Sequence, residues 1–292
     1  MGRALAAAWQ RAGASLELTH FTHAAPGSRP LDIRDGEATA RLVSSSKPDL
    51  VALPAANPYV DDCERHPEEN RRINVEGTRN VARACAAAGA RLLFFSTDYV
   101  FDGRKGSDYE EGDAPNPINE YGRQKLAAEG IVGGSSGGNL IVRSSAVYGW
   151  HEAPKNFVLQ ILDRLKKGQT VKAATDILYN PTNADNLAQV CVRLADVGAR
   201  GVYHVAGSER MSRFDFARHV AAAFGFDPGA VVPARSAEFG QPAARPALSS
   251  LSSARAARET GCELWGVARG LEEMRRGEDA WRRRWTGVSP AA

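Results

Sequence analysis

Short apolar runs alternate with amphipathic helical segments through the first half of the chain, and this alternation restricts the fold more than any other feature. The run RLLFFS at 91–96 is continuously apolar, as expected for a strand buried on both faces of a parallel sheet. The segment 73–90 before it predicts a helix whose apolar face holds Val75, Thr78, Val81 and Ala82. A helix around 120–130 and a strand over 139–149 follow. The pattern predicts an α/β fold with a doubly wound, Rossmann-type parallel sheet.

The chain begins on a helix instead of a strand. Leu5, Ala8 and Trp9 recur at helical spacing, and Gly13 ends this segment. The alternating stretch 15–19 predicts a strand, and an apolar strand is expected again at about 49–56. Doubly wound chains usually open on a strand and a loop that leads into the first helix, so the sequence raises the question of what precedes residue 1.

The second half of the chain is less regular. Helices are expected over 155–168 and 185–198, and 201–207 predicts a strand that returns to the sheet. Ser212 and Asp215 form a capping-box pattern at the start of another helix. We expect two parts, with the smaller one over the carboxyl edge of the sheet: a Rossmann-type domain at 1–149 and 181–207, and a lobe at 150–180 and 208–292.

Composition excludes several classes of protein. The 292 residues are 43% hydrophobic and 24% charged, which is typical of a globular domain with a large core. A net charge of +3 is too small to indicate nucleic-acid binding, and we interpret WRRRW at 281–285 as a solvated helix. No segment approaches the about 20 apolar residues of a membrane span. His20 and His23 are interpreted as surface residues, and no metal-ligand cluster is visible. The cysteines are scattered, which favours reduced thiols and a cytoplasmic location: Cys63, Cys85, Cys191 and Cys262.

One constellation carries the chemistry. Tyr121 and Lys125 are four residues apart on an expected helix and so project from the same face. Ser96 and Thr97 end a buried strand, where doubly wound sheets bind ligands. A nearby ammonium favours phenolate, so we expect Lys125 to lower the tyrosine pKa from about 10 toward the working pH. A Tyr–Lys pair at this spacing also arises by chance, but its place after a Ser-Thr strand end favours acid–base catalysis.

The sequence resembles the extended short-chain dehydrogenase/reductases, and within them the dTDP-4-dehydrorhamnose reductase-like branch. That branch also includes the beta subunit of methionine adenosyltransferase, which keeps the fold but serves as a partner. The resemblance runs from residue 1 almost to the C-terminus. It is carried by STDYVFDG (96–103), PNPINEYGRQK (115–125), VRSSAVYG (142–149), the run 61–78, NPT (180–182), YHVAG (203–207) with SRFDFA (212–217), and ARPALSSL (244–251).

The resemblance implies a reaction and a set of residues. Thr97 would be the catalytic hydroxyl, Tyr121 the proton donor, and Lys125 its partner and the holder of the nicotinamide ribose. Hydride would pass from NADPH to a ketone carbon of a nucleotide-linked 4-keto sugar. The remaining implied cofactor contacts are Gly2, Asp32, Ile33, Ala55, Ala56, Ser96 and Ser144. The implied substrate contacts are Val100, Phe101, Arg143, Asn156 and Arg245.

Several of these residues could instead have an ordinary structural role. Asp32 also fits an ordinary turn, Arg245 a surface arginine before a proline turn, and Asn156 and Arg143 structural hydrogen bonds. No acidic residue follows the expected strand 15–19, which favours NADPH over NADH without excluding NADH. A catalytically idle, partner-binding subunit is the alternative function, because one fold can serve both roles. The resemblance is compatible with a homodimer, while nucleic-acid and membrane partners are not expected.

The chain also departs from the family pattern. Gly2 matches the last glycine of the family's phosphate-binding turn, so the resemblance implies that the family's first strand and most of that Gly-rich loop would precede residue 1. We expect the sequence to be a shortened form of a longer protein. Leu53 and Pro54 stand where Asn-Ala is usual, and Ala146 stands where rhamnose-forming members carry Trp. The second difference removes a surface for sugar stacking, which favours another nucleotide sugar.

Overall fold

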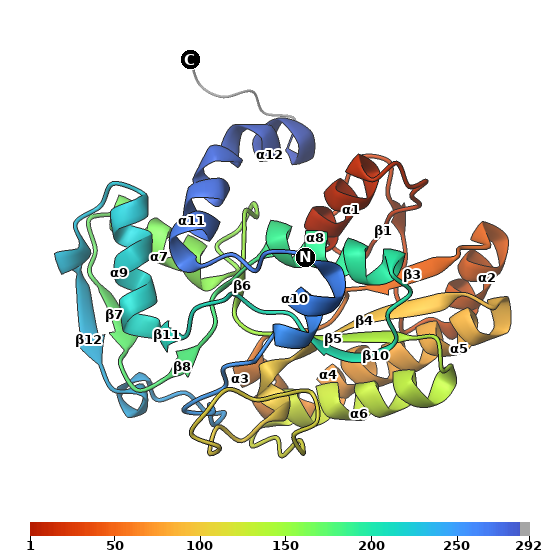
Figure 1. Ribbon diagram of the computed structural model, residues 1–292, viewed down its shortest axis with the longest axis horizontal. Helices are drawn as coiled ribbons and strands as arrows, with labels where there is room; N and C mark the ends of the chain where they lie inside the picture. The colour runs from red at the N-terminus through yellow and green to blue at the C-terminus, as the bar shows by residue number, and fades with distance from the viewer. Residues whose placement is uncertain (287–292) are drawn as a thin grey trace.

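The computed structural model describes residues 1–286 of the chain (Figure 1). Residues 287–292, at the end of the expected second lobe, lie outside this part. Four parallel strands form the main sheet in the order β10-β5-β4-β3. Their bounds are β3 (Leu50–Leu53), β4 (Arg91–Thr97), β5 (Leu140–Ser144) and β10 (Gly201–His204). The sheet confirms the predicted α/β fold and the return of the 201–207 segment.

Helices cover both faces of this sheet (Figure 1). On one face, α1 and α8 share an apolar core that includes Leu5, Leu93 and Leu187. On the other face, α5 and α6 pack on the sheet around Val81 and Phe94, both of which are buried. The helices of these layers are α1 (Gly2–Arg11), α2 (Gly36–Ser46), α5 (Thr78–Ala88), α6 (Glu120–Ser135), α8 (Ala184–Asp196) and α10 (Ala254–Thr260).

The predicted strand at 15–19 is wrong except for its last residue. Only β1 (Thr19–His20) is a strand, and it pairs in parallel with β2 (Arg29–Pro30). Within residues 1–286, β3 pairs only with β4, and three of its four residues remain partly exposed. A β-strand needs a hydrogen-bonded neighbour, and the stretch 14–18 has none over most of its length.

The helix predicted over 73–90 begins differently from the expectation. Arg72–Gly77 forms a π-helical turn (η1), which leads directly into α5. Two short helices, α3 (Val60–Arg65) and α4 (Pro67–Arg71), precede it. Single π-helical turns inside α-helices are often found near functional sites. Here the turn places Asn74 where its amide donates to Gln124 of α6, at 2.9 Å.

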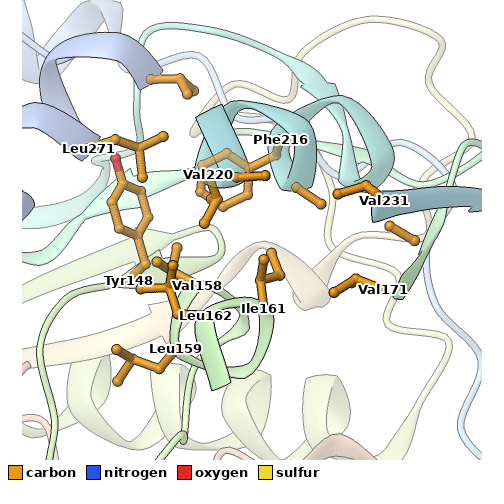
Figure 2. Close-up of a cluster of buried hydrophobic side chains, with 14 of the residues drawn as sticks. Tyr148, Val158, Leu159, Ile161, Leu162, Val171, Phe216, Val220, Val231 and Leu271 are labelled. Carbon is orange, nitrogen blue, oxygen red and sulfur yellow. The ribbon is translucent and has the colours of Figure 1, made fainter. Parts of the chain in front are cut away.

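A second apolar core is formed by side chains from the second half of the chain (Figure 2). Phe216 and Leu271 meet Tyr148 and Ile161 there, and each is at least 98% buried. Its main elements are α7 (Phe157–Lys166), β7 (Val171–Ala174), α9 (Arg213–Ala223), β12 (Val231–Ala234) and α11 (Val267–Arg276). Short elements connect it to the sheet: β6 (Val147–Tyr148), β8 (Leu178–Tyr179), β9 (Thr182–Asn183), β11 (Met211–Ser212), and the 3₁₀ turns Asp98–Val100, Pro228–Ala230 and Ser236–Phe239.

The WRRRW run forms part of α12 (Glu278–Trp285) and packs against the start of the chain. The Arg3 guanidinium of α1 lies 5.7 Å from the ring centroid of Trp281 and 5.4 Å from that of Trp285. The aromatic residues of the run therefore bind a cation of the same chain. Among residues 1–286, no helix combines the length and the apolar character that crossing a bilayer requires.

Candidate active site

The carboxyl end of β4 carries a buried carboxylate that the sequence analysis did not select. Asp98 is 4% exposed and accepts hydrogen bonds from the hydroxyls of Thr97 at 3.0 Å, Ser145 at 2.9 Å and Ser249 at 2.6 Å. Burial raises the pKa of Asp98, and the three hydroxyl donors oppose this rise. Its position directly after Thr97 at a strand end was the signal that could have identified it.

Tyr121 is placed by the first turn of α6. The side chain of Asn119 caps this helix by accepting from the Gly122 amide at 2.8 Å. Gly122 packs so closely on Tyr99 that a Cβ at this position would lie 2.1 Å from the Tyr99 carbonyl oxygen. The rings of Tyr99 and Tyr121 meet edge to face, with centroids 6.2 Å apart. The helix start is therefore held against the loop that leaves β4.

The pKa of Tyr121 corrects one expectation. Burial raises this pKa, the charge of Asp98 raises it further, and a hydrogen bond with Thr97 acts in the opposite direction. Lys125 does not bring it down as predicted. The Lys125 side chain is 3% exposed, and its Nζ lies 4.0 Å from the ring centroid of Phe94. Burial lowers the pKa of Lys125 to about 7, against the opposing charge of Glu129, so the lysine is only partly cationic near neutral pH.

Two expected cofactor residues lie at the strand ends of the sheet. The Ser96 hydroxyl is buried and has no hydrogen-bond partner within residues 1–286. Ser144 ends β5 directly beside Thr97 in the strand register, and it is 8% exposed. A buried hydroxyl without a partner is costly unless a ligand supplies one. Ser96 therefore fits a bound polar cofactor group.

The other expected cofactor residues lie around the start of α1 and the end of β3. A Cβ on Gly2 would meet Pro54 at 3.5 Å, so this glycine lies beside the segment that holds Ala55 and Ala56. Asp32 is held by Arg34, whose Nε and Nη2 donate to its Oδ2 at 2.9 and 2.6 Å. Ile33, the remaining residue of this set, packs against Gly77 at the end of η1, where a Cβ would lie 2.7 Å from the Ile33 side chain.

Three expected substrate contacts have partners in the protein interior. Val100 and Phe101 are fully buried, and Phe101 stacks on Tyr109 with ring centroids 4.1 Å apart. Arg143 is 4% exposed and forms a two-pronged ion pair with Glu129 at 2.9 and 2.7 Å. Val100 and Phe101 therefore pack in the apolar interior, and the charge of Arg143 is paired there with that of Glu129.

Asn156 and Arg245 line cavities, but both already have structural partners. Asn156 caps α7 and donates to the carbonyl of Gly149 at 2.7 Å. Both Nη atoms of Arg245 donate hydrogen bonds to the Asp61 carboxylate, at 2.6 and 2.9 Å. A different arginine, Arg213 at the start of α9, lines both cavities, and sequence reasoning missed it. Within residues 1–286, no group of three or more His, Cys, Asp and Glu side chains could hold a metal ion.

Comparison with known proteins places this geometry in a family. The model of the RmlD substrate-binding domain matches residues 1–276. The chain is 39% identical to the dTDP-4-dehydrorhamnose reductase of Mycobacterium tuberculosis over 76% of its length and 74% of that protein. It is 31% identical to the methionine adenosyltransferase 2 subunit beta of Bos taurus, over 70% of the chain and 63% of that subunit.

A solved structure gives the same result. The dTDP-4-dehydrorhamnose reductase of Bacillus anthracis, determined in complex with NADP, matches with a TM-score of 0.80 and 31% identity, over 85% of this chain and 89% of that one. The family match over residues 1–276 includes both the sheet and the second core. The chain belongs to the RmlD substrate-binding-domain family, in the dTDP-4-dehydrorhamnose reductase-like branch of the extended short-chain dehydrogenase/reductases.

Proposed function

We propose that the protein is an NADPH-dependent reductase that converts a keto group of a nucleotide-linked sugar to an alcohol. The observation that carries the proposal is the placement of Tyr121, Thr97 and Lys125 at the carboxyl end of β4, where the family's acid–base residues are expected. Thr97 is close enough to lower the pKa of Tyr121 against the effect of burial, and Lys125 follows Tyr121 by one helical turn. The family membership and the likeness to a reductase in complex with NADP support the same activity.

The protonation state of Tyr121 suits a reduction. A bound nicotinamide supplies the hydride, and the carbonyl oxygen must then receive a proton. Because burial raises the pKa of Tyr121, the phenol keeps its proton at neutral pH and can donate it to that oxygen. Thr97 can orient the carbonyl through its hydroxyl, which also donates to Asp98 in the free protein. Lys125 and Ser96 are the residues that would hold the cofactor beside this pair.

The sugar-facing wall contains Ala146. This residue adopts a positive φ of 42° and lines a cavity together with Asn156 and Phe157. A methyl group leaves space where rhamnose-forming members carry an indole. We therefore propose a nucleotide-linked keto sugar other than the rhamnose precursor as the preferred substrate.

A partner-binding subunit is the second candidate function. It is favoured by the likeness to the bovine beta subunit and by the position of Lys125, whose Nζ lies against the Phe94 ring. Under this alternative the protein binds nicotinamide cofactor without turnover. The two functions therefore differ in whether hydride leaves the cofactor.

The test is a transfer experiment. The protein is mixed with NADPH, deuterated at the transferred position, and a 4-keto-6-deoxy sugar carried on dTDP or on UDP. The reductase proposal predicts loss of the reduced-nicotinamide absorbance and deuterium at the new alcohol carbon, detected by NMR. NADH serves as the comparison cofactor and should react more slowly. Binding of NADPH without any transfer would support the second candidate instead.

A further inference from the structure

Two neighbouring cavities meet at one arginine. The first is lined by Lys172, Ser236 and Phe239, and the second by Ala146, Lys155 and Asn156. Arg213 and Phe157 line both. Arg213 therefore lies on the wall that the two cavities share.

The Arg213 guanidinium has unused hydrogen-bonding capacity. Its Nη2 donates to the Tyr99 hydroxyl at 3.2 Å, whereas its buried Nε has no hydrogen-bond partner among residues 1–286. No carboxylate in the same residues forms an ion pair with it. Arg143 and Arg245 differ from Arg213 in this respect, because their guanidinium groups form ion pairs with Glu129 and Asp61.

The surroundings of Arg213 offset only part of the cost of burying this charge. Its guanidinium lies 5.7 Å from the ring centroid of Phe157 and 5.6 Å from that of Tyr179. Cation–π contacts of this kind stabilise a guanidinium modestly, but they do not satisfy its N–H donors. A guanidinium fork with a free donor matches the geometry of phosphate oxygens, and Lys155 and Lys172 add positive charge in the two cavities.

Arg213 is connected to the proposed proton donor through one residue, and this placement suits the diphosphate of a nucleotide sugar. Arg213 donates to Tyr99, whose ring in turn touches that of Tyr121. Tyr99 therefore contacts both Arg213 and the ring of the proton donor. In a nucleotide sugar the diphosphate is attached directly to the sugar ring, so an anion site is required near the proton donor, with the nucleoside farther away.

We propose that Arg213 binds the diphosphate of the nucleotide-sugar substrate. This inference rests on the proposed function, because it assigns the substrate's anion to the same site. The phosphate of the cofactor is the other source of the same chemistry. The experiment must therefore distinguish a nucleoside diphosphate from the phosphorylated ribose of NADPH.

The test measures ligand binding without turnover. Wild type, Arg213→Met, Arg213→Lys and the control Arg218→Met are titrated by calorimetry with dTDP, UDP and 2′,5′-ADP. Arg218 lies on the same helix, is exposed and lines neither cavity. Loss of a charged hydrogen bond to phosphate predicts about 10- to 100-fold weaker binding of dTDP or UDP to Arg213→Met. Arg213→Lys should recover part of the affinity, and Arg218→Met should match wild type. Binding of 2′,5′-ADP should not change.

A stability measurement separates this role from a structural one. Because Arg213 is partly buried and has neither a carboxylate partner nor a partner for its Nε within residues 1–286, Arg213→Met should leave the melting temperature of the ligand-free protein unchanged or higher. A structural arginine would give a lower melting temperature.

In the binding and stability measurements, any one of four results would overturn the inference. They are a wild type that binds neither dTDP nor UDP, equal dTDP affinity in wild type and Arg213→Met, weakening confined to 2′,5′-ADP, and a destabilised Arg213→Met. If wild type reduces keto sugars and Arg213→Met keeps the same KM, this inference fails while the reductase proposal stands. If Arg213→Met loses dTDP binding but wild type never oxidises NADPH, the diphosphate site stands and the reductase proposal fails.

Discussion

Gly122 lies against the backbone of Tyr99 so closely that any side chain at position 122 would meet the Tyr99 carbonyl oxygen. This contact fixes the first turn of α6 against the loop after β4, and it thereby fixes Tyr121 beside Thr97. The contact connects a packing requirement with the position of the proposed proton donor. It also shows why a glycine follows the tyrosine in this helix.

Replacing Gly122 by alanine should therefore damage both stability and activity. The new Cβ would lie 2.1 Å from a backbone oxygen, which forces the helix start to move. Overpacking of this kind lowers the free energy of unfolding by about 1–3 kcal/mol or more. NADPH oxidation should fall by more than the loss of folded protein explains, because Tyr121 moves with the turn.

Gly130→Ala is the matched control for this prediction. Gly130 lies in the same helix, and a Cβ there would meet nothing within 4 Å. Alanine should raise the free energy of unfolding by up to about 1 kcal/mol through its higher helix propensity. Equal stability of the two variants in chemical denaturation would show that the Tyr99 contact does not constrain α6.

The Arg143–Glu129 ion pair should be structural. Glu129→Gln leaves the buried Arg143 without its counter-charge, which should lower the free energy of unfolding by about 3–5 kcal/mol. The double variant Arg143→Met/Glu129→Met should recover much of this loss, because no charge is left unpaired. Both effects can be measured by chemical denaturation.

Steady-state kinetics test the same pair for a role in binding. The KM of the double variant for the nucleotide sugar should equal that of wild type, because Arg143 lies in the interior. A large increase in this KM would show that Arg143 contacts the substrate.

Lys125 should make stability depend on pH. Below its folded-state pKa of about 7, the lysine is protonated in both the folded and the unfolded state. Between about 7 and the ordinary value of 10.5, the unfolded chain binds the proton and the folded protein does not, so the free energy of unfolding rises with pH. The rise should amount to a few kcal/mol, at about 1.4 kcal/mol per pKa unit.

Lys125→Met removes this dependence. Denaturation curves of the ligand-free protein at several pH values should show wild type gaining stability relative to Lys125→Met across that window. Parallel behaviour of the two proteins would mean that the buried lysine keeps an ordinary pKa.

The sequence predicted the features that depend on local spacing. The alternation of strands and helices follows from periodicity, and Tyr121 and Lys125 share a helix face because they are four residues apart. The strand at 15–19 failed because its pairing depends on a neighbour outside its own segment. The predicted lowering of the Tyr121 pKa was wrong because burial raises this pKa. Burial is not visible in the sequence, and it outweighs the charge of a lysine that is itself buried.

The arginines illustrate the same limit. Motif resemblance selected Arg143 and Arg245, yet each meets a carboxylate that only the tertiary structure brings near. Arg213 was missed because its free donor becomes visible only when the cavities and their walls are known. Asp98 depends on Ser249, which is 151 residues away in the chain.

Tyr121→Phe gives the most direct test of the proposed chemistry. The variant removes only the phenol oxygen and keeps the edge-to-face contact with Tyr99, and Tyr59→Phe at an exposed position is its control. With NADPH and a reducible keto-sugar nucleotide, kcat of Tyr121→Phe should fall by about 100- to 10,000-fold, the usual contribution of a general acid, while Tyr59→Phe matches wild type. A Tyr121→Phe protein that oxidises NADPH as fast as wild type would contradict the assignment of Tyr121 as proton donor.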